Sequence, residues 1–142
     1  MQHAQCARAG EEVSRATQLS CGEHTDYGLL TIVNQDDHIA ALQVKSATGA
    51  WVTAAPVPGA FVCNIGDMMR TWTNGLYRPT LHRVLNADAT RSRVSMPYFY
   101  EPGFDTLVTP QLGLRGSSLP AVVPARHYGS HLESKVFLNF EL

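Results

Sequence analysis

The sequence has little cysteine, and the cysteines it has do not form a recognisable framework. Cys6, Cys21 and Cys63 are the three in 142 residues, an odd number at irregular spacing, and no two stand in a C-x-x-C pair. This argues against the disulfide scaffold of a small secreted domain and against common zinc spacings. We therefore expect a reducing compartment, with Cys21 and Cys63 as small, buried apolar residues.

The sequence also lacks a strong charge of either sign and a long apolar run. Its formal net charge is -1, which gives no electrostatic reason to expect nucleic acid or an anionic membrane as a partner. No apolar stretch approaches the roughly 18 residues that a membrane span needs. Residues 1–20 are polar, without the apolar core of a signal peptide. We expect a soluble, cytoplasmic protein.

What the sequence does contain is a series of short, β-rich runs. The chain is long enough for one domain with a single core. Turn-forming pairs such as Asp36-Asp37 and Thr48-Gly49 separate the runs. We predict strands at 29–34, 41–46, 51–56, 60–66, 81–87 and 93–102. Several short strands at spacings near ten residues are typical of an all-β sandwich or barrel rather than of alternating β-α units.

The two ends of the chain differ from this central part. Residues 1–19 have weak periodicity and are interpreted as a poorly defined lead-in. We expect one β-domain over 20–108, followed by a loop and a helix over 109–142. The helix is predicted in HYGSHLESKVFLNF, where apolar residues recur at roughly helical spacing although Gly129 weakens the prediction.

One set of polar residues has the composition of a metal site. His24 and Asp26 are separated by one residue in GEHTDYGLLTI, and His82 follows 58 positions after His24, at the start of a predicted strand. A His-x-Asp pair without further support is more often a chance pair than part of a metal site. Two imidazoles and one carboxylate, however, form the ligand set of non-haem Fe(II) oxygenases, which keep coordination positions for co-substrate and O₂.

A pair suited to a carboxylate follows the second histidine. Arg93 and Ser95 are two residues apart, so strand alternation places them on the same face. A guanidinium beside a hydroxyl suits a carboxylate, because the planar fork donates charge-assisted hydrogen bonds. The order of the motifs therefore makes chemical sense as a metal site followed by an acid-binding site.

With these motifs the chain resembles the isopenicillin N synthase-like branch of the 2-oxoglutarate- and Fe(II)-dependent oxygenases. The matching segments are GEHTDYGLLTIVNQDD, ALQVKSATGAWVTAAPVPGAFVCNIGDMMRTWTNGLYRPTLHRV and RSRVSMPYFYEP, which together cover about residues 21–108. The resemblance implies a mainly β fold, the double-stranded β-helix or jelly roll. It further implies His24, Asp26 and His82 as iron ligands, with Arg93 and Ser95 binding the distal carboxylate of 2-oxoglutarate.

The same resemblance implies an activity and its cofactors. Fe(II), 2-oxoglutarate as co-substrate, O₂ and ascorbate as a candidate reductant would support hydroxylation or oxidation of a small organic molecule, with release of succinate and CO₂. Two alternatives stay open. One is an Fe(II)/O₂ oxidase of the isopenicillin N synthase type that does not use 2-oxoglutarate, and the other is a truncated, inactive metal- or partner-binding β-domain.

Family members are usually much longer, with N-terminal helices and a first strand for which this sequence shows no pattern. We therefore expect a jelly roll that lacks these parts, or a partner chain that supplies the missing strand. Tyr27, Leu30 and Phe99 are candidate pocket-lining residues, although ordinary core positions explain them as well. His127 and His131 stand four apart near the predicted helix, where a surface pair is a simpler interpretation than a second metal site.

Overall fold

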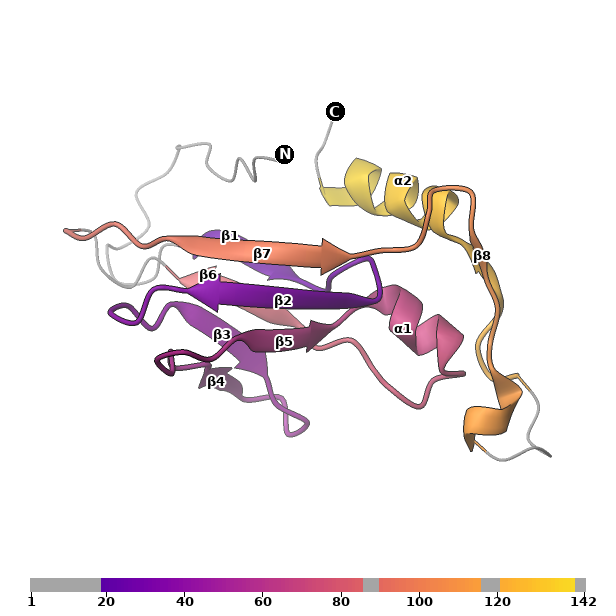
Figure 1. Cartoon of the computed structure of the whole chain (residues 1–142), viewed down its shortest axis with the longest axis horizontal. Coiled ribbons are helices and arrows are strands. Elements are labelled where there is room, and N and C mark those ends of the chain that lie inside the picture. Colours follow the sequence, from indigo (N-terminus) through magenta and orange to yellow (C-terminus); the bar gives the residue numbers. More distant parts are fainter. Residues whose placement is uncertain (1–18, 86–89, 116–120, 140–142) are drawn as a thin grey trace. The chain divides into compact units, whose positions relative to one another are not determined.

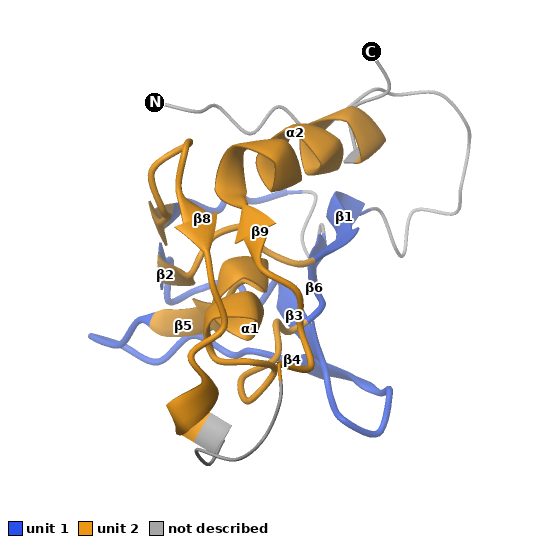
Figure 2. Ribbon diagram, turned by 90° about the vertical axis from the view of Figure 1, so that its right-hand side faces the viewer, with its two compact units in different colours: residues 1–24, 34–61, 81–96 blue, residues 25–33, 62–80, 97–142 orange. Residues whose placement is uncertain are grey.

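The computed structural model describes residues 19–85, 90–115 and 121–139 (Figure 1). The chain divides into two compact units, which are distinguished by colour in Figure 2. Unit 1 comprises Met1–His24, Asn34–Phe61 and Leu81–Met96, and unit 2 comprises Thr25–Val33, Val62–Thr80 and Pro97–Leu142. The predicted N-terminal lead-in lies almost entirely outside the described residues.

Unit 1 contains a four-stranded antiparallel sheet in the order β1-β6-β3-β4. Its strands are β1 (Leu19–His24), β3 (Leu42–Lys45), β4 (Trp51–Thr53) and β6 (His82–Leu85). Because β6 lies between β1 and β3, His82 is paired with His24 on one side and with Val44 on the other. The Trp51 ring packs against the guanidinium of Arg83, 4.1 Å from its centroid, a favourable cation–π arrangement.

A second sheet has the order β5-β2-β7. Its strands are β2 (Leu30–Gln35), β5 (Val62–Ile65) and β7 (Ser95–Tyr100). The register of β2 with β5 is antiparallel, from Leu30 opposite Ile65 to Val33 opposite Val62. Among the described residues, β7 lies at the edge of this sheet, and each of its six residues is exposed. Phe99 is 46% exposed, so the interpretation of Phe99 as an ordinary core residue is wrong.

The helices belong to unit 2. They are α1 (Asp67–Trp72) and α2 (Tyr128–Asn139), accompanied by the short strands β8 (Leu107–Val108) and β9 (Arg126–His127) and the 3₁₀ turn η1 (Leu112–Arg115). Met68 of α1, Val108 of β8 and Tyr128 of α2 form a buried apolar cluster. The burial of these side chains joins the three elements, and Figure 2 shows α2 next to the β8-β9 pair.

The six strands predicted from periodicity are confirmed as β2 to β7, and the C-terminal helix is confirmed as α2. Gly129 lies within α2, where a Cβ would come within 2.7 Å of the Phe104 ring, so a larger residue at this position would force that ring to move. The cysteine interpretation is wrong, since Cys63 is exposed and Cys21 is half-buried. No helix in the described ranges is long and apolar enough to cross a membrane.

Two turns differ in their backbone geometry. In the turn at residues 72–75, Asn74 has φ 52° and Gly75 has φ 78°, and Asn74 Oδ1 accepts a hydrogen bond from the Val122 N–H at 2.8 Å. Gly66, in contrast, has φ −98° and caps α1. A Cβ there would lie 2.3 Å from the Gly28 carbonyl oxygen, so close backbone contact is what requires glycine.

Substitution of Gly66 by alanine should therefore destabilise the chain. The added methyl group meets backbone atoms that cannot rotate away, and we expect Gly66→Ala to lower the free energy of unfolding by about 1–3 kcal/mol. The measurement is urea denaturation followed by circular dichroism. Gly22→Ala is the matched control, since nothing lies within 4 Å of a Cβ there. An unchanged midpoint for Gly66→Ala would contradict this account of the turn.

Candidate metal centre

Strand pairing in unit 1 brings two histidines together. His24 is the last residue of β1 and His82 the first of β6, and they occupy opposite positions in the register. Their ring centroids are 4.2 Å apart with the planes tilted by 56°, and His82 is buried. Two residues 58 positions apart thus present adjacent imidazoles, as a metal site requires.

A backbone contact determines which nitrogen of His24 carries its proton. Nδ1 lies 2.8 Å from the carbonyl oxygen of Gly22, and a carbonyl only accepts hydrogen bonds. Nδ1–H is therefore the donor, and the ring lone pair is on Nε2. Metal-binding histidines commonly have this arrangement, because a backbone carbonyl fixes both the tautomer and the orientation of the ring.

Asp26 is held in place by one residue of β5 and one of α1, within unit 2. Its side chain is buried, and Oδ2 accepts a hydrogen bond from Asn64 Nδ2 at 2.6 Å. The Asp26 carbonyl accepts the backbone N–H of Asp67 at 2.8 Å. Because Asp26 follows His24 by two residues, the chain itself keeps their Cα atoms within about 7 Å. Neutral imidazoles and one carboxylate form a donor set that fits Fe(II).

Arg93 stands two residues before Ser95, which is the first residue of β7. Arg93 Nη1 donates to Ser95 Oγ at 3.2 Å, and Nη2 donates to Gln35 Oε1 at 3.1 Å. Its Nε is buried and has no hydrogen-bond partner among the described residues. Burial lowers the pKa of Arg93, an effect that the nearby Asp36 opposes. A half-buried guanidinium with neutral partners and an orphaned donor is suited to binding a carboxylate.

The candidate pocket-lining residues have different environments. Tyr27 is half-buried, and the Nζ of Lys135 lies 5.8 Å from the centroid of its ring. Leu30 is half-buried at the start of β2, and Phe99 is exposed on β7. Their role in a pocket stays a prediction.

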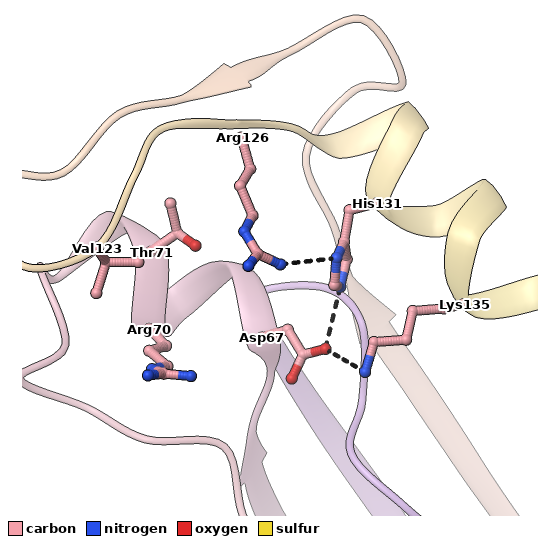
Figure 3. Close-up of a pocket in the computed structure, with 7 residues that line it drawn as sticks. All are labelled: Asp67, Arg70, Thr71, Val123, Arg126, His131 and Lys135. Carbon is pink, nitrogen blue, oxygen red and sulfur yellow. Dashed lines mark hydrogen bonds and ion pairs between the residues drawn. The ribbon is translucent and has the colours of Figure 1, made fainter. Parts of the chain in front are cut away.

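Asp67, His131 and Lys135 form a polar cluster that sequence reasoning missed, and we call it the Asp67 cluster (Figure 3). Asp67 Oδ2 lies 3.0 Å from His131 Nε2 and 3.0 Å from Lys135 Nζ. His131 is buried in α2, whereas His127 is exposed on β9. The predicted surface pair is therefore wrong for His131, because the contact with α1 takes its ring out of solvent.

The hydrogen bonds of the cluster hold Asp67 in its charged form. Burial has the largest single effect and raises the pKa of Asp67, but the hydrogen bonds from His131, Lys135 and Thr25 together outweigh it. The pKa of Asp67 is therefore lowered from its ordinary value. An acid with a lowered pKa stabilises the fold above its unfolded pKa, and this contribution is lost as the pH falls through the folded pKa.

Stability measurements at acidic pH should detect this contribution. Asp67→Asn keeps the size of the side chain and removes its charge, so the wild-type chain should be the more stable near pH 6. The difference in unfolding free energy should shrink below about pH 4, where the unfolded carboxyl takes up its proton. Asp105→Asn, at an exposed turn position, should show no such convergence. A difference for Asp67→Asn that is independent of pH would contradict the assignment.

Comparison with known proteins places the chain in a family. Residues 3–102 match the 2OG-Fe(II) oxygenase superfamily. The chain is 52% identical over 125 residues to homoarginine-6-hydroxylase 2-ODD-233 of Oryza sativa subsp. japonica, covering 87% of this chain and 38% of that protein. It is 46% identical to 1-aminocyclopropane-1-carboxylate oxidase of Dictyostelium discoideum, covering 61% of this chain and 23% of the oxidase.

The structural comparison agrees with the sequence comparison. The crystal structure of JOX2 in complex with 2OG, Fe and JA matches with a TM-score of 0.69 at 34% identity, covering 82% of this chain and 38% of JOX2. The chain belongs to the 2OG-Fe(II) oxygenase superfamily, and its mainly β fold is the jelly roll of these enzymes. It spans about two fifths of the length of the rice relative.

Proposed function

We propose that this chain provides an Fe(II)- and 2-oxoglutarate-dependent oxygenase activity toward a small organic molecule, with His24, Asp26 and His82 as the iron ligands. The observation that carries the proposal is the pairing of β1 with β6, which places the two imidazoles 4.2 Å apart. Among the described residues, these two histidines and Asp26 also form a group able to hold a metal ion. Membership of the superfamily supports iron as that metal.

The chain's own residues have separate roles in this proposal. Bound Fe(II) would supply the redox chemistry that uses O₂ and 2-oxoglutarate, with release of succinate and CO₂. The Gly22 carbonyl holds the Nδ1 proton of His24 and so directs Nε2 toward the metal. Asn64 holds one carboxylate oxygen of Asp26, and this contact limits rotation of the ligand.

Arg93 and Ser95 are proposed to bind the distal carboxylate of 2-oxoglutarate. The two side chains already contact each other, so the guanidinium and the hydroxyl can face one acid together. Gln35 accepts a hydrogen bond from the second terminal nitrogen of Arg93 and thereby limits the orientations of the guanidinium group. Such preorganisation lowers the entropic cost of binding the co-substrate.

The relatives suggest substrates to test. The similarity to a plant homoarginine-6-hydroxylase makes an amino acid with a guanidino side chain the first candidate. A second candidate function is an Fe(II)/O₂ oxidase of the isopenicillin N synthase type that does not use 2-oxoglutarate, and the similarity to an enzyme named 1-aminocyclopropane-1-carboxylate oxidase favours testing an oxidase. Iron-dependent formation of succinate separates the two functions. Ascorbate is the reductant to include in either assay.

Three further proposals concern classification and setting. We place the chain in the isopenicillin N synthase-like branch, on the basis of its HTD and RVS motifs and the NIGD segment. We propose a cytoplasmic location, which the odd number and irregular spacing of the three cysteines support. A partner chain that completes the sheet stays a proposal, for which the exposed edge strand β7 is the supporting feature.

The test is an anaerobic titration of the purified chain with Fe(II) and 2-oxoglutarate, recording the visible metal-to-ligand charge-transfer band. We expect the band in the wild-type chain and its loss in His82→Ala, which removes one of three protein ligands. His38→Ala is the matched control, because His38 lies exposed in a turn. A band that persists in His82→Ala, or a folded wild-type chain that gives none, would overturn the proposal.

Substitution of Arg93 tests the co-substrate site separately from the metal. Arg93→Ala should still bind Fe(II) but should need about 10- to 100-fold more 2-oxoglutarate to develop the band, as expected for the loss of charged hydrogen bonds worth about 1.5–3 kcal/mol. Arg78→Ala removes an exposed arginine and should leave the requirement unchanged. Normal use of 2-oxoglutarate by the Arg93 variant would refute the assignment.

A further inference from the structure

Asp67 connects the backbone of a proposed iron ligand to the C-terminal helix. It is the first residue of α1, and its backbone N–H donates to the Asp26 carbonyl at 2.8 Å. Its side chain bonds His131 and Lys135 of α2. Figure 3 shows both α2 side chains pointing toward the Asp67 carboxylate. All of these contacts lie within unit 2.

The same cluster reaches the residues on both sides of Asp26. Thr25 donates a side-chain hydrogen bond to the Asp67 carboxylate. Lys135, which also bonds that carboxylate, lies over the ring of Tyr27. The segment from Thr25 to Tyr27 is therefore contacted at each residue by Asp67 or by the lysine that Asp67 holds.

Hydrogen bonds and burial restrict the side chains of the Asp67 cluster to one arrangement. His131 and Lys135 are four residues apart in α2 and so lie on the same helix face. Arg126 Nη1 lies 3.4 Å from His131 Nδ1, and because a guanidinium only donates, Nδ1 is the acceptor and Nε2–H donates to Asp67. The His131 side chain is only 5% exposed, which restricts its movement further.

We propose that Asp67 is a positioning residue for the metal site, through which α2 fixes the Thr25–Tyr27 backbone and so keeps the Asp26 ligand in place. Asn64 orients the Asp26 carboxylate, and Asp67 sets the position of the backbone that carries it. This inference rests on the proposed function, since it takes Asp26 to be an iron ligand. It assigns to the C-terminal helix a role in metal affinity in addition to its role in the core.

A purely structural role would give a different result. Loss of the cluster would then lower the stability of unit 2 without changing the affinity of folded molecules for metal. Val108→Ala is the control for this case, because Val108 packs in the apolar cluster with Met68 and Tyr128 and has no part in the polar contacts. It should lower the unfolding temperature while the metal dissociation constant and spectrum stay at wild-type values.

The experiment is a titration of the full chain with Co(II), a spectroscopic substitute for Fe(II), well below the unfolding temperature. We expect Asp67→Ala to bind Co(II) about 10- to 100-fold more weakly, as is usual when a residue that supports a metal ligand is removed, and to shift the visible ligand-field bands. Glu133→Gln changes one exposed acid on α2 and should have no effect. Wild-type affinity and spectrum in folded Asp67→Ala would overturn the inference.

The lysine provides a second test that does not depend on the folding of Asp67→Ala. Lys135→Met should weaken Co(II) binding, and Lys135→Arg should restore most of it, because arginine keeps the charge and can still reach the carboxylate. Equal affinities for these two variants would also overturn the inference. The wild-type titration separates the two proposals: a folded wild-type chain that binds neither Co(II) nor Fe(II) refutes the proposed function itself.

Discussion

The antiparallel pairing of β1 with β6 is the interaction on which the candidate site depends. It places two distant histidines opposite each other, and it does so with an irregular register that shifts between Cys21 and His24. An extra residue in one strand bends it and redirects a side chain. The short bond from His24 to the Gly22 carbonyl lies within this irregular stretch, so the same local distortion that orients the ring also fixes its tautomer.

Much of the fold could be predicted from the sequence because six strands carry alternating, β-branched patterns that do not require tertiary information. β1 could not, since LSCGEH has little alternation and becomes a strand only through its pairing with β6. α1 was missed for a related reason. Its six residues are too few for a helical pattern to show, and such short helices are stabilised by packing, here of the fully buried Met68.

The site residues divide in the same way. Residue type and spacing made His24, Asp26, His82, Arg93 and Ser95 candidates, and their roles are those that the family resemblance implies; all five lie within the described residues. Asn64 and Gln35 could not be found, because an amide side chain has many uses and only sheet pairing shows which carboxylate or guanidinium it meets. The interpretation of His131 as a surface residue failed because its burial depends on Asp67, 64 positions away in the sequence.

Each of the two compact units contains one tryptophan. The sequence contains two tryptophans. Trp51 belongs to unit 1 and is stacked against a guanidinium, whereas Trp72 belongs to unit 2 and ends α1. The fluorescence of one tryptophan can therefore report on each unit, and only Trp51 is described with a guanidinium against its ring. Single-tryptophan versions of the chain would let the opening of one unit be followed in time without interference from the other.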